Sequence, residues 1–293
     1  MELIKHFRRD VTATDIFLLA VLRDENILIE YFIKYYKKKG ITNFILIDNG
    51  SVDGSFEYLK KLDENILLFS THEFYKNAEY GAKWINTLLQ KYCKNHWCLV
   101  VDIDELLYID NINTLINEMK SSGSTLCNMF LLDMYSKKLT NYKRGEDFIK
   151  HCNYFDKFSN YYNYNSNKTI KSSISGGVRN RVLNMNPCLN KRSFFYNNFE
   201  SIKLSCGYHW INNNNTKFIK IHTRVQYLLH FKFIKPNFHE FIKNRIANNQ
   251  DWDNSSEYKI LKNLNFSELY DKKFSVELKN KSQLDNIFNK IVF

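Results

Sequence analysis

Two aspartates one residue apart follow a strongly apolar run in the first half of the chain. Asp102 and Asp104 flank Ile103 and come directly after Trp97-Cys98-Leu99-Val100-Val101. Carboxylates at positions i and i+2, just past a buried strand, can approach one hard cation together, and Mg²⁺ and Mn²⁺ prefer such oxygen ligands while keeping positions open for substrate phosphates. The triplet therefore predicts a divalent-cation site that binds a diphosphate. The alternative is a pair of solvated loop carboxylates that cap the next helix.

Polar side chains also follow three other apolar runs. Asp48 precedes Asn49-Gly50-Ser51, and its carboxylate could accept hydrogen bonds from a uracil or ribose edge or could shape the loop as an Asx-turn. Arg23 could pair with a phosphate or with Asp48, and Glu25 could bind a ribose or cap a helix. His72, in Thr71-His72-Glu73, completes this set of candidate nucleotide-binding residues.

The apolar runs before these groups predict strands, because short continuous apolar runs are typical of parallel strands buried on both faces. The predicted strands are residues 16–21, 44–47, 66–69 and 97–101, and the predicted helices are residues 24–39 (capped by Asp24 and ended by Gly40), 55–62, 79–92 and 114–119. This alternation predicts an α/β fold with a mostly parallel sheet and right-handed crossovers. Ligands of such sheets bind beyond the carboxyl ends of the strands, so the polar groups should share one rim.

The second half of the chain is less regular. Residues 136–200 are rich in Asn, Tyr, Lys and Ser and predict long loops with an antiparallel hairpin or two around Gly176-Gly177. Residues 218–221 and 225–233 are predicted to form strands, and residues 238–248 a helix. From residue 253 onward we expect a helical accessory tail.

Composition limits the class of protein. Of 293 residues 44% are hydrophobic, and 42 Lys+Arg against 31 Asp+Glu give a net charge of +11. The basic residues are dispersed rather than striped, so we expect no nucleic-acid partner. The six cysteines form no Cys-x-x-Cys pair, which argues against a zinc or redox motif and favours a reducing compartment. Without a signal peptide or an apolar stretch of ~20 residues, we expect a cytoplasmic protein. Its charge is compatible with peripheral attachment to the cytoplasmic face of an anionic membrane.

Three motifs together resemble family 2-like glycosyltransferases. They are Ala20-Val21-Leu22-Arg23-Asp24-Glu25, then Ile47-Asp48-Asn49-Gly50-Ser51-Val52-Asp53-Gly54-Ser55, then the run from Trp97 to Asp102-Ile103-Asp104-Glu105. They look similar to the subgroup with an Asp-x-Asp-Glu motif that is related to family 92 enzymes, although Asp24 replaces the usual Asn of the first motif. The resemblance implies a GT-A fold, a nucleotide-sugar donor bound through the triplet, Ile103 included, and Mn²⁺ or Mg²⁺ as cofactor.

The resemblance also implies a division of the chain and further site residues. Residues 1–245 would form the GT-A domain, with a nucleotide-sugar-binding half of about 14–135 and an acceptor half of about 136–245, and residues 246–293 a helical extension. His230, which ends Leu228-Leu229-His230, matches the late histidine that such enzymes add to the metal, with His209 as its alternative. Lys83 matches a helix that faces the donor, and Arg179 and Arg181 match a glycine-arginine segment placed near the acceptor or donor sugar.

The catalytic base has no clean match. An inverting transfer needs a carboxylate or a histidine to take the proton of the acceptor hydroxyl. Asp133 ends the apolar run Leu131-Leu132 and is the first candidate; the weaker alternatives are Glu146, Asp147 and Asp156. Inverting stereochemistry is therefore only what the resemblance implies.

The sequence thus predicts transfer of a sugar from a nucleotide-diphosphate sugar, with uridine as the expected base, to a glycan or lipid-linked glycan such as lipopolysaccharide or capsule. One alternative is a nucleotidyltransferase that acts on sugar phosphates. The Gly-rich, basic loop that such enzymes carry after the first strand is missing from Leu22-Arg23-Asp24-Glu25. The other alternative is a non-catalytic basic module that binds a membrane or nucleic acid.

Overall fold

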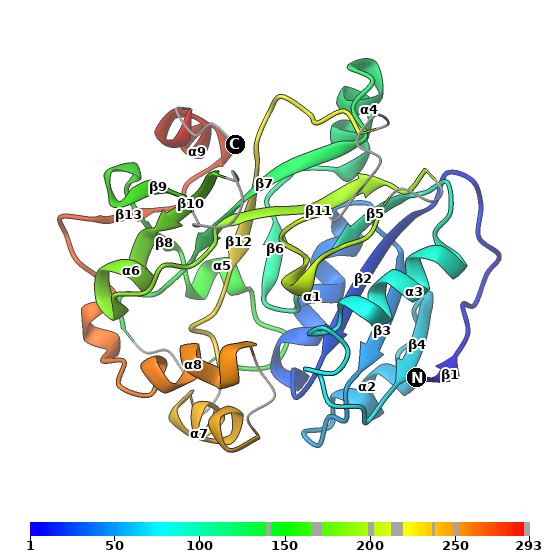
Figure 1. Cartoon of the computed structure of the whole chain (residues 1–293), viewed down its shortest axis with the longest axis horizontal. Coiled ribbons are helices and arrows are strands. Elements are labelled where there is room, and N and C mark those ends of the chain that lie inside the picture. The colour runs from blue at the N-terminus through cyan, green and yellow to red at the C-terminus, as the bar shows by residue number, and fades with distance from the viewer. Residues whose placement is uncertain are drawn as a thin grey trace.

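The computed structural model describes residues 1–138, 142–165, 172–198, 202–211, 219–235, 238–248 and 252–289. Within these residues the chain is organised around a nine-stranded sheet with the order β1-β4-β3-β2-β5-β11-β7-β12-β6 (Figure 1). Its strands are β1 (Glu2–Lys5), β2 (Ile16–Leu22), β3 (Asn43–Asp48), β4 (Ile66–Ser70), β5 (Trp97–Val100), β6 (Glu105–Leu107), β7 (Leu126–Asp133), β11 (Asn190–Tyr196) and β12 (Gln226–His230).

The strand directions explain how a single rim collects polar groups. β4, β3, β2 and β5 pair in parallel, and β7 pairs in parallel with β12. β11 lies between β5 and β7 and is antiparallel to both, so β5 and β7 run the same way. Six of the nine strands therefore have their carboxyl ends at one edge. The predicted fold class, an α/β fold with a mostly parallel sheet flanked by helices, is confirmed.

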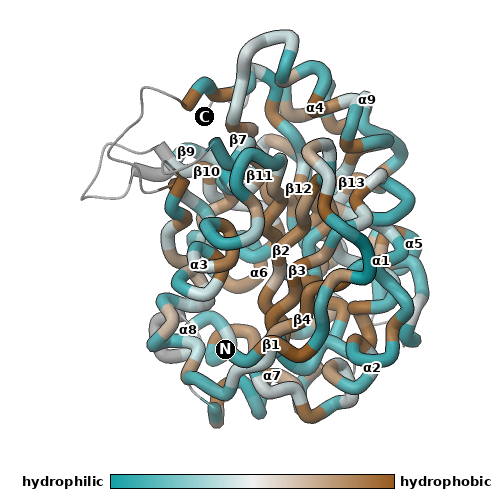
Figure 2. Tube along the Cα trace, turned by 90° about the vertical axis from the view of Figure 1, so that its right-hand side faces the viewer, coloured by the Kyte–Doolittle hydropathy of each residue, from teal (hydrophilic) through white to brown (hydrophobic). Residues whose placement is uncertain are grey.

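The helices of the first half cover both faces of the sheet. They are α1 (Asn26–Lys38), α2 (Ser55–Lys61), α3 (Ala82–Tyr92) and α4 (Ile112–Ser121). Alternate residues of β2 point to opposite faces: Leu18 and Ala20 share a core cluster with Phe32 of α1, whereas Leu19 packs in a second cluster with Leu88 of α3. Figure 2 shows the result, with hydrophobic strands in the centre and mostly hydrophilic segments outside.

The second half adds smaller units to this core. Strands β9 (Tyr161–Asn165) and β10 (Ser172–Gly176) form an antiparallel hairpin, as predicted around Gly176-Gly177, and β8 (Tyr154–Asp156) pairs with β13 (Ser275–Glu277). The helices are α5 (Phe148–His151), α6 (Gly177–Leu183), α7 (Phe238–Asn248), α8 (Trp252–Leu261) and α9 (Lys281–Phe288). Helices α7 and α8 lie side by side at one end of the molecule (Figure 1) and share a third apolar cluster. Helix α9 packs on the main core through Leu284 and Phe288.

Several predicted elements need correction. Asp24 does not cap α1: the helix starts at Asn26 after Glu25, and the Asp24 carboxylate instead accepts a hydrogen bond from the backbone N–H of Val52. In the predicted strand 218–221, residue 218 lies outside the described residues, and Ile221 makes only an isolated bridge with Leu126. The tail is not purely helical, because β13 lies within it. In the described part of the chain, no helix has the length and apolar character needed to cross a bilayer.

Candidate active site

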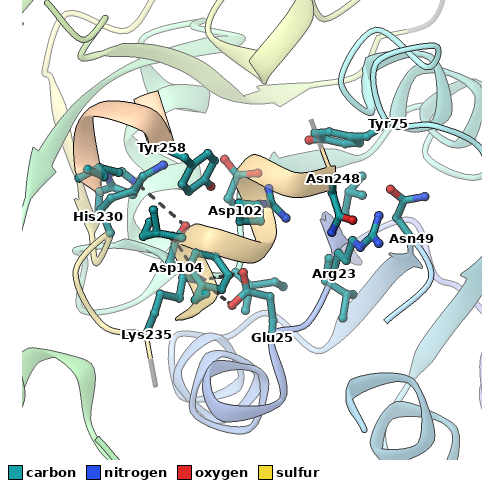
Figure 3. A pocket seen from close by; sticks show the side chains of 18 residues that line it. Arg23, Glu25, Asn49, Tyr75, Asp102, Asp104, His230, Lys235, Asn248 and Tyr258 are labelled. Atoms are coloured by element: carbon teal, nitrogen blue, oxygen red, sulfur yellow. Dashed lines mark hydrogen bonds and ion pairs between the residues drawn. The ribbon is translucent and has the colours of Figure 1, made fainter. Parts of the chain in front are cut away.

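A pocket opens where the carboxyl ends of β2, β3, β5 and β12 meet helices α7 and α8 (Figure 3). Strand ends and the loops after them supply one part of its lining: Val21, Leu22, Arg23, Glu25, Asn49, Tyr75, Asp102, Ile103, Asp104, His230, Lys232 and Lys235. The helices supply the rest: Phe241, Ile242, Arg245, Asn248, Tyr258 and Leu261. The pocket therefore joins the predicted acidic triplet to a helical pair about 140 residues further along the chain.

Asp104 and His230 face each other across the pocket wall. Nε2 of His230 lies 3.9 Å from Oδ1 of Asp104, and Nδ1 of the same ring lies 2.6 Å from Oδ1 of Asp133. The register of the sheet creates this contact, because His230 of β12 is the direct cross-strand neighbour of Asp133 of β7. Burial alone would raise the pKa of Asp133, but Arg179 and His230 lower it to about 2. An ionised Asp133 can only accept, so Nδ1 of His230 is the donor in this contact and Nε2 is directed toward Asp104.

This arrangement fits a divalent cation in the type of its donors. A metal-binding histidine commonly donates its other ring N–H to a carboxylate, as His230 does to Asp133. Asp102 lies on the same triplet, and its side chain is 43% exposed, so it can reach a cation and a diphosphate. Within the described ranges, however, no three His, Cys, Asp or Glu side chains already stand together as a finished metal site. The ligands Asp102, Asp104 and His230 would have to move closer around an ion.

Each aspartate of the triplet also faces a buried lysine. Lys235 Nζ lies 2.6 and 2.7 Å from the two oxygens of Glu25 and 3.7 Å from Oδ2 of Asp104 (Figure 3). Lys191 Nζ lies 2.5 and 2.7 Å from the oxygens of Glu105 and 3.3 Å from Oδ2 of Asp102. Neither lysine, nor Glu105, was predicted as a site residue.

The electrostatics of these pairs follow from burial. Burial raises the pKa of Glu25 to about 7, against the opposing effect of Lys235. It raises the pKa of Glu105 to about 7 as well, although Lys191 opposes it. For Asp104 the effect of burial is overcome by Lys235, His230 and Lys232, which hold the pKa of this carboxyl far below its usual range. Asp104 is therefore ionised at neutral pH, in a pocket to which Arg23, Lys232, Lys235 and Arg245 add positive charge.

The nucleotide-binding candidates lie on the other side of the triplet. Arg23 lines the pocket next to Asn49, and Figure 3 shows both side chains, with Tyr75, on the side of Asp102 away from Lys235. Asp48 shapes its loop, because Oδ2 accepts hydrogen bonds from the N–H groups of Gly50 and Ser51. Its Oδ1 is buried and has no hydrogen-bond partner among the residues that the structure describes.

The loop after β3 also brings in His72. Gly50 has φ +70°, and a Cβ at this position would come within 3.0 Å of Nδ1 of His72. The exposed imidazole of His72 therefore lies against the backbone of the Asp48 loop. Ile103, by contrast, is 2% exposed and anchors the triplet in the main apolar cluster while its edge lines the pocket.

Other predicted residues lie outside the pocket lining. Lys83 is exposed at the start of α3 and donates to the carbonyl of Asn77. Arg179 is buried behind the pocket, where it pairs with Asp133 and Glu257. Arg181 makes two hydrogen bonds to Asp156, which is fully buried. These contacts explain why Arg179 and Arg181 hold internal carboxylates rather than present themselves to a ligand.

Two of the base candidates, Asp133 and Asp156, and the second histidine are similarly occupied. Asp133 binds Arg179 through one oxygen and His230 through the other, so it lies behind the imidazole and does not face the pocket. Asp156 is enclosed by Arg181 and by the hydroxyl of Tyr135. His209 directs Nδ1 to the carbonyl oxygen of Asn190 at 2.7 Å, one residue before Lys191.

The residues that sequence reasoning missed come mainly from β11 and from the segment after β12. Lys235, Arg245 and Tyr258 line the pocket from a region that was predicted to serve the acceptor or the tail. A signal was present for Lys235, since it follows the predicted His230 strand closely. No comparable signal marked Lys191, because β11 contains too many polar residues to be recognised as a strand from the sequence.

Comparisons with known proteins show a distant likeness of fold. Neither a protein-family model nor the sequence of a curated protein matches this chain. Solved structures of S. aureus TarS are similar over 85% of this chain. TarS residues 1–349 has 12% identity, a TM-score of 0.37 and 69% of its length covered. The complex of that fragment with UDP has 11% identity, a TM-score of 0.40 and 70% coverage. A longer TarS structure has 14% identity, a TM-score of 0.38 and 42% coverage, so the chain spans less than half of its length.

Proposed function

We propose that this protein is a metal-dependent glycosyltransferase that moves a sugar from a nucleotide-diphosphate sugar, with uridine as the nucleoside, to a glycan or lipid-linked glycan. The observation that carries the proposal is the facing pair of Asp104 and His230, held by Asp133 from behind, at the carboxyl rim of a parallel sheet. Ligands of open α/β sheets bind at this rim. The alternatives, a nucleotidyltransferase or a binding module, have no specific observation in their favour.

The donor's nucleoside would lie toward β3. The unpartnered, buried Oδ1 of Asp48 supports this orientation, because a buried acceptor without a donor is costly and a uracil or ribose donor would satisfy it. Arg23, at the neighbouring strand end, would bind phosphate. The aromatic ring of Tyr75 in the same part of the lining offers a face for the base or the sugar.

The diphosphate would lie between the triplet and the α7–α8 pair. Mn²⁺ or Mg²⁺ held by Asp102, Asp104 and His230 would neutralise the charge that develops as the nucleoside diphosphate leaves. Lys232, Lys235 and Arg245 line the same pocket and contribute positive charge there. Electrostatic stabilisation of this kind is strongest where water is excluded.

The acceptor and the stereochemistry complete the proposal. We propose an inverting transfer to a polysaccharide or glycolipid acceptor. Asp133 and Asp156 both have internal partners, so neither is proposed as the base. The net charge of +11 favours acceptors that are anionic or lie at an anionic membrane.

Calorimetric titration with uridine, guanosine and cytidine diphosphates, each with and without Mn²⁺, tests the proposal. We expect uridine diphosphate to bind, and its affinity to fall when Mn²⁺ is removed. Asp104→Asn should abolish most of the metal dependence, since it removes the carboxylate that faces His230. If no nucleoside diphosphate binds in the presence of Mn²⁺, or if Asp104→Asn retains full metal-dependent binding, the assignment is wrong.

A further inference from the structure

The residue after the acidic triplet, Glu105, is buried and directed inward, although it belongs to the same acidic run as Asp102 and Asp104. Glu105 is 2% exposed, and it begins β6 rather than lining the pocket. Its Oε2 accepts a hydrogen bond of 2.9 Å from the backbone N–H of Asp102. Through this hydrogen bond the Glu105 carboxylate closes the turn formed by residues 102–105.

The partner of Glu105 is an equally buried lysine from a distant part of the chain. Lys191 is 1% exposed and binds both oxygens of Glu105 at 2.5 and 2.7 Å. The same ammonium group lies 3.3 Å from Oδ2 of Asp102. An ammonium has three donors, so two can serve Glu105 while the third is directed to Asp102.

The sheet topology places Lys191 there. β11 runs antiparallel between β5 and β7, so its amino end lies at the rim where the carboxyl end of β5 leads into the triplet. Phe194 pairs with Leu99 at the end of this ladder, and Lys191 lies beyond it on the side of the triplet, where Nζ reaches Asp102. The antiparallel strand β11 therefore places Lys191 at the rim where the parallel strands end in carboxylates.

We propose that Glu105 and Lys191 form a positioning pair for Asp102, fixing both its backbone and its carboxylate for the donor complex. The inference rests on the proposed function, which it deepens. Replacing one partner of a buried ion pair usually destabilises the folded protein strongly, because the other charge is left unpaired. Replacing both partners by neutral side chains of similar size is often tolerated. The pair therefore contributes orientation rather than stability, and the two contributions can be measured separately.

The test is the double variant Glu105→Gln/Lys191→Met, titrated with uridine diphosphate at increasing Mn²⁺. The expected result is a melting temperature close to that of the wild type, together with at least a tenfold higher Mn²⁺ concentration for half-maximal binding, in line with the ~10–100-fold effects of groups that orient metal ligands. The matched control is Glu64→Gln/Lys37→Met, which neutralises an exposed ion pair by the same substitutions. It should leave the Mn²⁺ dependence unchanged.

Unchanged or tighter Mn²⁺ dependence in a stable double variant would overturn the inference, because Lys191 would then only balance a buried charge or compete with the cation. If the double variant has a lower melting temperature, the Mn²⁺ dependence of the single variant Glu105→Asp is measured instead, with the same outcomes supporting or overturning the inference. This substitution keeps the charge but shortens the reach to Lys191 and to the Asp102 N–H. Failure of the wild-type protein to bind uridine diphosphate would refute the proposed function itself. If the wild-type protein binds uridine diphosphate and only the variants differ in their Mn²⁺ dependence, the result concerns the Glu105–Lys191 pair alone.

Discussion

His230 and His209 were both candidates for the metal from the sequence, and their surroundings differ. His230 lies in the pocket lining, 3.9 Å from Asp104, and its other nitrogen is held by an ionised carboxylate. His209 is held by a backbone carbonyl and contacts the segment that precedes Lys191. A carboxylate partner raises the basicity of an imidazole ligand more than a carbonyl does.

We therefore predict that His230→Ala weakens Mn²⁺ binding by at least about tenfold, whereas His209→Ala has a smaller effect. Electron paramagnetic resonance of free Mn²⁺ in the presence of uridine diphosphate measures both variants under the same conditions. The reverse order would exchange the roles of the two histidines. Equal losses in both variants would indicate that each binds the metal.

At the residue scale, the sequence predicted the groups that carry local signals. Asp102, Asp104, Arg23, Glu25 and His230 each follow an apolar strand and do line the pocket. Groups whose position depends on long-range pairing were not predictable in this way. Lys191 meets Glu105 across 86 positions of sequence, and Lys235 meets Glu25 across 210, and neither contact leaves a pattern in the local sequence.

At the scale of elements, amphipathic and apolar periodicity located most of the first half. The predicted helix 238–248 coincides with α7, and residues 16–21 lie within β2. β11 was missed although it is a central strand, because Asn190, Lys191 and Ser193 are polar residues buried within it. When polar residues of a strand contribute to a site, they interrupt the continuous apolar run by which strands are recognised in a sequence.

One carboxylate of helix α8 forms two ion pairs with basic residues. Glu257 binds Arg179 at 3.0 Å and Lys232 at 3.1 Å, and its side chain is 28% exposed. Burial would raise the pKa of Glu257, but Lys232 and Arg179 lower it from 4.5 to about 2. Because the folded-state pKa lies below the unfolded value, this stabilisation is present above pH 4.5 and is lost as the pH falls toward 2.

Glu257→Gln should therefore lower the free energy of unfolding by about 1–2 kcal/mol at pH 7, allowing for the partial exposure of the group. The difference from the wild type should shrink when urea unfolding is repeated near pH 3. Glu2→Gln, at an exposed position of β1, is the matched control and should change neither value. A difference of the same size at both pH values would show that Glu257 acts by packing and not by its charge.

At the scale of the whole molecule, the net charge determines how the protein interacts with charged surfaces. An excess of eleven positive charges, 42 Lys+Arg over 31 Asp+Glu, surrounds a pocket whose own carboxylates are largely paired. The excess therefore acts mainly at the surface. Each basic residue near an anionic bilayer contributes on the order of 1 kcal/mol, and this attraction decays within a Debye length of about 10 Å at 0.1 M salt.

We predict that the protein sediments with vesicles rich in phosphatidylglycerol at low ionic strength and is released as the salt rises toward ~1 M, where the Debye length falls to about 3 Å. Vesicles of phosphatidylcholine alone are the control and should retain none of it, since they present no net charge. Binding that survives high salt would indicate an apolar contact instead of a charge effect. If anionic vesicles fail to bind the protein at low salt, the basic surface has another partner, and a lipid-linked acceptor would have to reach the pocket without help from the membrane.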